Sequence, residues 1–333
     1  MADERKFYQH TQYLNEWKPA LDVKARNTRV LSALREELKD KNRIDKNRIK
    51  VLECGAGTGR GLVSLITEGI LTNAEVHAFD IEQELIGAMP QLFQQFALKK
   101  GWRYIPEEMD SKTEFTFRVQ DDKDQIDLRI HGFSESVYVL LRRAQELSDI
   151  DIITGQAFIE HTKSDIVYPI LKSLLACNGL VYFSLNCDGW FYYSPSRSAE
   201  RDEKVAGLFN DIALNNQEFR DRYGAIIGGE AFCGRNLPYR FVEEGLEVLA
   251  FGPSDWVVTP FTQHQSEEER DFLRYTSTYI KEACLGSSKE LRDKWNLSDE
   301  KIYQWFEEKQ EAINRHEAGF TCVQKDILGR KKG

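Results

Sequence analysis

The stretch VLECGAGTGRG, residues 51–61, places glycine at four alternate positions directly after a short apolar run. Residues 49–52 are typical of the end of a buried strand, and apolar residues recur at helical spacing over 62–66. A backbone needs glycine where it takes a positive φ or passes close to another group. The stretch therefore predicts a strand, a tight turn and a helix whose first N–H groups face a ligand above the strand end.

Composition and charge narrow the class of protein. The chain has 333 residues, 41% hydrophobic and 30% charged, which is ordinary for a soluble globular protein of one large or two small domains. The formal net charge of −9 weighs against a protein that holds nucleic acid through phosphate contacts. The sequence predicts no transmembrane helix and no secretory signal, and its six cysteines form no CxxC pair. We therefore expect a cytoplasmic protein with buried thiols.

Strand and helix patterns alternate through the first half of the chain. Strands are expected at 49–54, 75–80, 127–131, 150–154 and 180–185, and helices at 82–99, 136–146 and 164–176. This alternation predicts a parallel, doubly wound α/β sheet. Within the polar stretch 101–125, the alternating residues 113–119 predict an inserted hairpin or loop.

Two common nucleotide-binding patterns do not fit the glycine turn. Dinucleotide folds use G-x-G-x-x-G, but the sixth position counted from Gly55 is Arg60, and counted from Gly57 it is Leu62. The Gly-Lys-Ser/Thr of a P-loop is also missing from this stretch. The pattern that does fit is acid-x-Gly-x-Gly-x-Gly, over residues 53–59.

This pattern resembles the first motif of the class I S-adenosylmethionine-dependent methyltransferases. Asp80 ends the expected second strand, 25 residues after Gly55, where the resemblance implies a carboxylate that accepts both ribose hydroxyls. Two further matches are DIITGQAFIEH at 151–161 and NGL at 178–180, which opens the fifth strand. The ordered set covers about residues 49–190.

The resemblance implies a Rossmann-like, seven-stranded sheet with an antiparallel edge hairpin, plus helical cap insertions. It implies S-adenosylmethionine as the cofactor and S-adenosylhomocysteine as its product. Strand six is expected at about 246–251, continuing as far as 259, and strand seven at 319–327. The domain division that follows is 1–48 as an N-terminal helical cap segment, 49–195 as the S-adenosylmethionine-binding core, 196–262 as cap helices and strand six, 263–316 as a helical insertion, and 317–333 as the last strand and tail.

The implied cofactor site lies at the strand ends. The glycines let the backbone approach the methionine end of the cofactor, and Glu53 lies beneath it to attract the ammonium. Ile81 covers one adenine face, and Phe133 or Ser134 borders the ring edge; simple core packing stays open for Ile81 and Phe133. The predicted cofactor-binding set is Glu53, Gly55, Ala56, Gly57, Gly59, Asp80, Ile81, Phe133, Ser134 and Gln156.

The predicted catalytic residues are His161 and its neighbour Glu160, just past the fourth strand. The unperturbed pKa of a histidine, about 6.5, suits proton removal from a hydroxyl acceptor near neutrality. A structural role, capping or packing the next helix, is the alternative for His161. The run 159–161 also resembles the ubiquinone-pathway O-methyltransferases and the small-RNA 3′-end methyltransferases, which bind a metal. Those relatives carry an acid three residues before the Glu-His pair, where this chain has Ala157, so no metal is expected.

Aromatic residues are the candidates for the acceptor site. The segment 186–193 is expected as an aromatic loop beside the transferred methyl, and it would serve either as an acceptor wall or as a hydrophobic latch. Arg235 would bind an acceptor carboxylate or, alternatively, the protein's own carboxylates. The predicted substrate-binding set is Tyr8, Tyr13, Trp190, Tyr192, Tyr193 and Arg235.

These inferences predict a methyltransferase that acts on a small molecule, through an oxygen or nitrogen nucleophile, by in-line displacement. An RNA or protein methyltransferase of the same fold, or a catalytically silent partner protein, are the alternatives. We expect a small-molecule substrate, no nucleic acid and no membrane association, and the sequence leaves a homodimer open.

Overall fold

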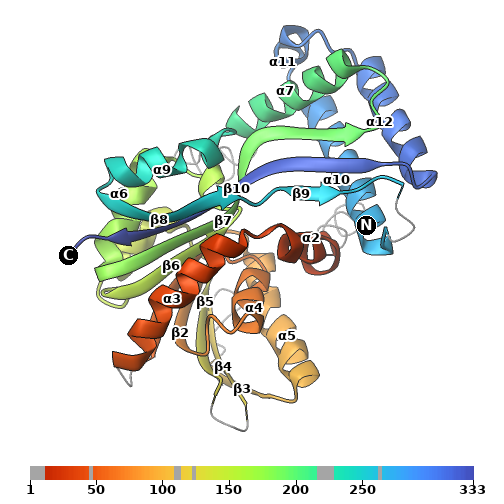
Figure 1. Ribbon diagram of the computed structural model, residues 1–333. Helices are drawn as coiled ribbons and strands as arrows, with labels where there is room; N and C mark the ends of the chain where they lie inside the picture. The colour runs from red at the N-terminus through yellow and green to blue at the C-terminus, as the bar shows by residue number, and fades with distance from the viewer. Residues whose placement is uncertain (1–11, 45–47, 109–113, 122–124, 216–228, 262–264) are drawn as a thin grey trace.

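The computed structural model describes residues 12–44, 48–108, 114–121, 125–215, 229–261 and 265–333. Within these residues, ten strands form one sheet in the order β3-β4-β5-β2-β1-β6-β7-β10-β8, with β9 pairing β10 beside this path (Figure 1). The strands are β1 (Ile49–Cys54), β2 (Asn73–Phe79), β3 (Arg103–Glu108), β4 (Glu114–Gln120), β5 (Asp127–Phe133), β6 (Ile150–Gln156), β7 (Leu175–Ser194), β8 (Leu246–Pro253), β9 (Trp256–Val258) and β10 (Gly319–Lys331).

Helices connect the strands and build the cap. They are η1 (Tyr13–Trp17), α2 (Lys18–Ala25), α3 (Thr28–Ile44), α4 (Arg60–Thr67), α5 (Gln83–Lys100), η2 (Val137–Arg143), η3 (Ile159–His161), α6 (Ser164–Leu174), α7 (Ala199–Asn215), α9 (Cys233–Glu243), α10 (Glu267–Gly286), α11 (Lys289–Lys294) and α12 (Asp299–Asn314). Of these, η1 is a π-helix and η2 and η3 are 3₁₀-helices. Among the described helices, none has an apolar stretch that could span a bilayer.

The doubly wound sheet is confirmed, but its strand number was wrong. Strands β5, β2, β1, β6 and β7 are parallel neighbours, as the alternation of strands and helices predicts. The predicted antiparallel edge hairpin is formed by β8 and β10, with β10 lying between β7 and β8. The expected seven strands become ten because β3 and β4 extend the opposite edge as an antiparallel hairpin and β9 pairs with β10.

Two apolar layers hold the helices against the two faces of the sheet. One layer joins residues of α3, α4 and α5, such as Leu34, Leu62 and Phe93, to the inward side of β1, β2, β4 and β5. The other joins residues of η2, α6 and α9, such as Leu171 and Phe241, to the opposite side of β1, β6 and β7. Because successive strand residues face opposite sides, each strand contributes to both layers.

Strand β7 is longer than the sequence indicates. The predicted fifth strand, 180–185, and the predicted aromatic loop after it form one strand of 20 residues, Leu175–Ser194. It pairs with β10 from Leu180↔Arg330 to Ser194↔Gly319, with two register shifts on the way. The expectation of a loop at 186–193 was therefore wrong, because backbone pairing with β10 continues past the core sheet.

The Asp326 carboxylate supports the bend between these two strands. Leu185 has a φ of +56°, which a branched side chain rarely adopts, and lies beside one of the register shifts. Its N–H donates to Asp326 Oδ1 at 2.8 Å, and the N–H of Asn27 donates to Asp326 Oδ2 at 2.9 Å. One buried acid thus links β7, β10 and the start of α3.

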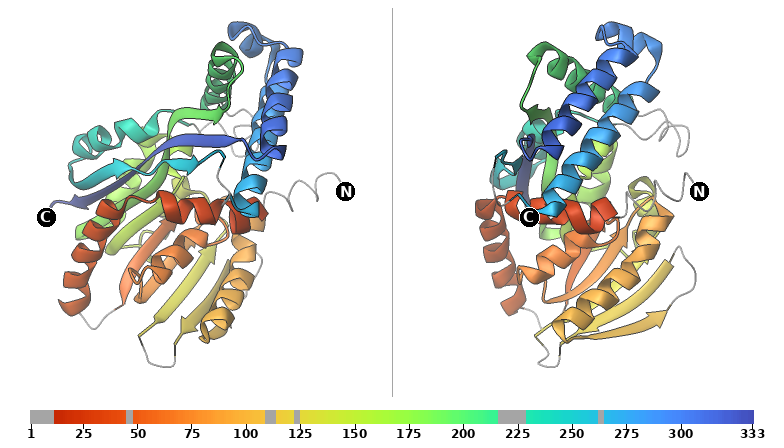
Figure 2. Two further views of the ribbon diagram at one scale, coloured as in Figure 1. Left: turned by 45° about the vertical axis from the view of Figure 1, so that its right-hand side comes forward. Right: turned by 90° about the vertical axis from the view of Figure 1, so that its right-hand side faces the viewer.

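The far ends of β7 and β10 form the floor of a helical cap (Figure 2). A third apolar cluster joins these strand ends to α2, α7, α10 and α12 and includes the fully buried Phe272 and Trp305. Helices α10, α11 and α12 occupy the chain between β9 and β10, so they are an insertion before the last strand.

We predict that Asp326→Ala lowers the free energy of unfolding by about 3 kcal/mol, because two backbone N–H groups lose their charged acceptor. Asp326→Asn keeps one acceptor oxygen and should lose about 1 kcal/mol. Urea unfolding at neutral pH measures both values. Equal losses for the two variants would contradict the role given to the carboxylate.

Candidate functional site

Three glycines of the turn after β1 have positive φ angles. Gly55, Gly57 and Gly59 have φ values of +64°, +51° and +89°, and Gly59 is the N-cap of α4. The sequence prediction of strand, tight turn and helix is therefore correct. These angles are strained for any other L-residue, which accounts for three of the four glycines without a ligand.

The space around each glycine differs. A Cβ on Gly55 would lie 2.7 Å from the Phe158 ring, and one on Gly59 would lie 2.8 Å from the Phe93 ring. A Cβ on Gly61 would lie 2.9 Å from Glu53 Oε1. Gly57 has no atom within 4 Å of that position among the described residues. Three glycines therefore allow internal packing, and Gly57 is the one whose open side faces unfilled space.

Asp80 is held against this open position. Its Oδ2 accepts a hydrogen bond from the N–H of Gly57 at 2.7 Å, and its Oδ1 accepts one from the N–H of Glu82 at 2.8 Å. Burial raises the pKa of Asp80 to about 6, against the effect of these two donors. Each carboxylate oxygen has more than one lone pair, so both oxygens can accept a further hydrogen bond from a ligand.

Glu53 is buried below the turn. Only 2% of its surface is exposed, and its Oε2 accepts a hydrogen bond from the Thr154 hydroxyl on β6. Burial raises the pKa of Glu53 to about 7, while the Thr154 hydrogen bond and the charge of Arg26 act in the opposite direction. Glu53, Arg26, Thr154 and Gln156 line a small cavity under the turn. A cation bound nearby would therefore favour the ionised form of the Glu53 carboxyl group.

Hydrogen bonds join the N-terminal helices of the cap to this site. The Thr58 hydroxyl donates to Asn15 Oδ1 of η1 at 2.6 Å. Gln156, at the end of β6, donates to Asp22 Oδ2 at 2.5 Å and accepts from the Arg26 guanidinium at 2.7 Å. The oxygen and the nitrogen of the Gln156 side-chain amide, a predicted cofactor-binding group, are therefore both hydrogen-bonded to residues that follow η1.

Sequence reasoning missed Asn15, Asp22 and Arg26 as residues of this site. Asp22 also accepts a hydrogen bond from the Trp256 indole at 2.9 Å, and Asp22 and Arg26 are 5% and 6% exposed. The signal available was an acid and a base four residues apart within the expected N-terminal helical cap segment. Gln156 and Trp256, two of their partners, lie more than a hundred residues away, so the spacing alone indicated no site.

The residues predicted on the adenine side are in or beside the core. Phe133 is buried and stacks on Phe79 with ring centroids 4.7 Å apart, and the Arg143 guanidinium lies 4.3 Å from the Phe133 centroid. These contacts are typical of core packing, the alternative left open for Phe133, and its place beside the cofactor stays a prediction. Ile81 and Ser134 are half-buried at the ends of β2 and β5. Ala56 is buried, and its N–H donates to the Phe79 carbonyl at 2.9 Å.

The two predicted catalytic residues have opposite surroundings. His161 is exposed at the end of η3, and its imidazole has no hydrogen bond to the described residues. Glu160 is 7% exposed, and burial raises the pKa of its carboxyl group. Its Oε1 accepts from the Cys187 N–H at 3.3 Å, while its Oε2 is buried without a partner among the described residues.

The predicted acceptor residues do not form one wall. Tyr8 lies outside the described residues. Tyr193 is 3% exposed and its hydroxyl lies 2.6 Å from Thr276 Oγ1, so it belongs to the cap core. Trp190 and Tyr192 are about half exposed on β7. Tyr13 stacks on Tyr275 of α10 with centroids 4.4 Å apart.

Arg235 binds one of the protein's own carboxylates. Its Nε donates to Asp188 Oδ1 at 2.7 Å, and its backbone N–H donates to the same oxygen at 3.0 Å. Its guanidinium also lies 4.8 Å from the centroid of the Phe232 ring. This is the second of the two alternatives that the sequence left open for Arg235.

Comparison with known proteins gives distant structural likenesses only. No family model and no curated protein matches the chain. Among solved structures, a putative methyltransferase from Bacillus halodurans C-125 is similar at 11% identity, with a TM-score of 0.42, over 91% of this chain and 100% of that one. A cyclopropane synthase from Mycobacterium tuberculosis is similar at 12% identity and a TM-score of 0.39, over 91% and 83% of the two chains. A geranyl diphosphate methyltransferase is similar at 10% identity and a TM-score of 0.37, over 90% and 78%.

Glu53 should make stability fall as the pH rises. Its pKa of about 7 in the folded state lies above the ordinary value of 4.5, so its contribution is complete below pH 4.5 and is lost as the pH rises through 7. Glu53→Gln removes this loss. We predict that the unfolding free energy of Glu53→Gln, relative to the native chain, rises by about 3 kcal/mol between pH 4.5 and pH 8. Urea unfolding across this range tests it, and a difference that does not vary with pH would contradict the buried, protonated carboxyl.

Proposed function

We propose that the protein is an S-adenosylmethionine-dependent methyltransferase that acts on a small-molecule acceptor. The observation that carries the proposal is the pairing of the Asp80 carboxylate with the Gly57 N–H, next to the one glycine of the turn that faces open space. A carboxylate, a glycine backbone and a helix N-terminus at the carboxyl ends of parallel strands fit a nucleoside-containing ligand.

The Asp80 carboxylate supplies the recognition of the ribose. Its two oxygens each hold one backbone N–H and keep lone pairs for the two ribose hydroxyls. The backbone donors also fix the orientation of the carboxylate before the ligand arrives. A preorganised acceptor of this kind loses little side-chain freedom on binding.

Glu53 and its surroundings supply the recognition of the positive amino acid end. Glu53 is buried with a raised pKa, so a cation bound above it favours the ionised carboxylate and releases a proton. Arg26, beside it, has a buried Nε without a partner among the described residues, a donor that fits a ligand carboxylate. The bound cofactor supplies an electrophilic methyl group on a sulfonium.

The cap orients the acceptor and excludes water. Helix η1 lies against the glycine turn through the Asn15–Thr58 hydrogen bond and carries Tyr13 and Trp17, which contact Tyr275 of α10. A π-helical turn is rare and is often found at functional sites. Aromatic faces suit a small organic acceptor or a cationic amine. Orientation alone can contribute up to about 7–11 kcal/mol to an in-line displacement.

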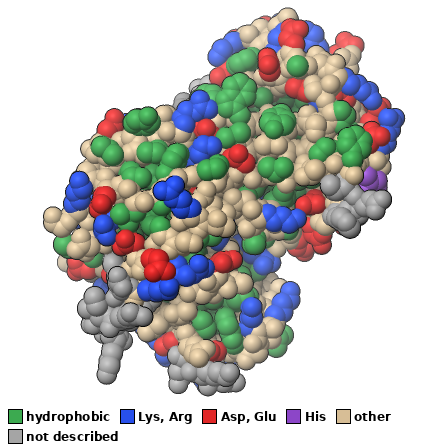
Figure 3. Space-filling model, in the orientation of Figure 1, with side chains coloured by type: hydrophobic (Ala, Val, Ile, Leu, Met, Phe, Trp, Pro, Cys, Tyr) green, Lys and Arg blue, Asp and Glu red, His purple; other side chains and the backbone are tan. Residues whose placement is uncertain are grey.

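Surface charge supports a small-molecule acceptor over a nucleic acid. The chain has a net charge of −9, and acidic and basic side chains are mixed over the face in Figure 3. A protein that tracks a phosphate backbone concentrates its Lys and Arg in one patch or stripe.

Binding of S-adenosylhomocysteine, measured by calorimetry, tests the proposal. We predict binding in the micromolar range for the native chain and a loss of at least about 10-fold for Asp80→Ala, since hydrogen bonds to a charged acceptor contribute about 1.5–3 kcal/mol. Asp165→Ala, which removes an exposed carboxylate on α6, is the matched control and should bind as the native chain does. An absence of binding by the native chain would overturn the proposal.

His161 is proposed as the base for a hydroxyl acceptor. We predict that His161→Ala lowers kcat about 100-fold or more, while the affinity for S-adenosylhomocysteine stays the same. Transfer of a labelled methyl group measures kcat, and calorimetry with S-adenosylhomocysteine measures the affinity. An unchanged kcat would make His161 structural.

A further inference from the structure

One part of the sheet has a polar, solvent-facing side. On β4 and β5 the apolar residues Phe115, Phe117, Leu128 and Ile130 face α5, and their alternate neighbours face the other way. The connection from β5 to β6 is short and contains only the 3₁₀-helix η2, so it leaves this side of β2, β4 and β5 partly uncovered. The result is an open hollow of about 440 Å³, lined mostly by charged and polar residues.

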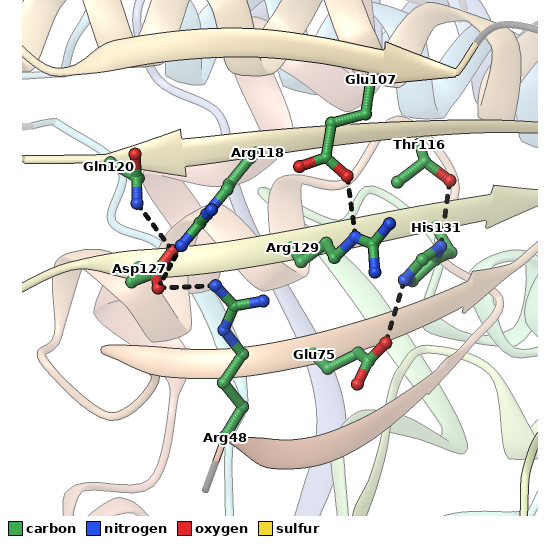
Figure 4. Close-up of polar contacts among 9 residues, drawn as sticks. All are labelled: Arg48, Glu75, Glu107, Thr116, Arg118, Gln120, Asp127, Arg129 and His131. Carbon is green, nitrogen blue, oxygen red and sulfur yellow. Dashed lines mark hydrogen bonds and ion pairs between the residues drawn. The ribbon is translucent and has the colours of Figure 1, made fainter. Parts of the chain in front are cut away.

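Most charges on this face are paired with one another (Figure 4). Asp127 accepts two hydrogen bonds from Arg118, both at 2.7 Å, and one from Arg48 at 2.6 Å. Arg129 donates to Glu107 at 2.8 Å. Because these groups already have partners of opposite charge, no ligand is needed to explain why they stand on this face.

Two histidines and a glutamate form a separate cluster in the hollow. His77 on β2 and His131 on β5 are directly opposite in the parallel ladder, and their rings stack with centroids 4.9 Å apart. Glu75 Oε1 lies 3.2 Å from His131 Nε2, and Figure 4 shows the two side chains pointing toward each other across neighbouring strands. One ligand atom from each of Glu75, His77 and His131 lies within 4.8 Å of the other two.

The buried side chain of His77 lacks a hydrogen-bond partner. It is 9% exposed, and its Nδ1 is buried with no partner among the described residues. A buried polar atom left unpaired costs about 1–3 kcal/mol. Packing alone therefore does not explain why a histidine stands at this position.

His131 is oriented as a metal ligand would be. Its Nδ1 lies 3.0 Å from the hydroxyl of the buried Thr116. In the structure Nε2 donates to Glu75 Oε1 and Nδ1 accepts from the Thr116 hydroxyl. In the other tautomer Nδ1 donates to Thr116 Oγ1, and the lone pair of Nε2 is then available to a metal ion that also binds Glu75. Histidine ligands typically donate their second ring N–H to such an outer partner, which fixes the tautomer.

We propose that Glu75, His77 and His131 bind a zinc ion on this open face of the sheet. Two imidazoles and one carboxylate are a donor set that suits Zn²⁺, and the hollow admits water as a fourth ligand. Ligand atoms around tetrahedral zinc are on the order of 3.3 Å apart, so the side chains need to move by about 1–1.5 Å. The nearby cations are engaged elsewhere: Arg143 pairs with Glu135 at 2.6 Å, and Lys50 donates to the Ser148 carbonyl at 3.4 Å.

This site is separate from the proposed cofactor site in chemistry and in position along the strands. His77 and His131 lie within β2 and β5, on the side away from α4 and α5, whereas the glycine turn and Asp80 lie beyond the strand ends. Zinc binding and cofactor binding can therefore be measured independently.

Calorimetric titration of Zn²⁺ into the full chain, after removal of metal with a chelator and dialysis, tests the proposal. We expect one equivalent to bind in the micromolar range or tighter. Glu75→Gln, His77→Gln and His131→Gln should each lower the affinity about 100-fold, and Thr116→Val should lower it about 10–100-fold. Co²⁺ should give the visible absorption of a tetrahedral site in the native chain and lose it in His131→Gln.

Two control variants guard against incidental binding. His316→Gln and Cys177→Ser each remove an exposed potential ligand outside the hollow and should leave the zinc affinity unchanged. Thermal unfolding in the absence of zinc establishes that each variant is folded. Unchanged binding in His131→Gln, loss of binding in either control, or no binding by the native chain overturns the proposal.

Discussion

The pairing of β7 with β10 is the interaction on which the rest of the structure depends. These two strands are the longest described in the sheet, and they run from its β7–β10–β8 side into the cap. Their core ends lie between the apolar layers, and their far ends carry Tyr193 and Phe320 into the cap cluster. The β7–β10 ladder shifts register between these two regions. The Asp326 carboxylate stabilises this irregularity, because it accepts a hydrogen bond from the N–H of Leu185 there.

Three acids with raised pKa values mark the carboxyl edge of the parallel strands. Glu53, Asp80 and Glu160 follow or end β1, β2 and β6, and burial disfavours the charge on each. A fold that only needed stability would place apolar residues there. Their clustering at one edge creates a site that becomes more favourable when a cation or a set of hydrogen-bond donors arrives. The edge where η1 and α2 lie over the strands therefore favours a ligand that carries a positive charge or hydrogen-bond donors.

Local patterns in the sequence predicted the sheet core well, and the site only in part. Alternation and helical spacing identified the parallel strands, and the glycine pattern identified the turn with Glu53 and Asp80. The extension of β7 was missed because the run NCDG at 186–189 is typical of a turn, whereas its actual conformation is set by β10, more than 130 residues later. Arg26 and Asp22 were missed for the same reason: their roles arise from contacts with Gln156, which no local pattern encodes.

The position of β10 between β7 and β8 has a consequence for biosynthesis. This strand occupies Gly319–Lys331, and it supplies the hydrogen bonds that join two strands synthesised earlier. Until residues 319–331 have been synthesised and have folded, β7 and β8 each expose an unpaired edge, which is the kind of surface that other chains can pair with. Translation that stops before residue 319 therefore leaves a nascent product with two open edges in place of a finished sheet.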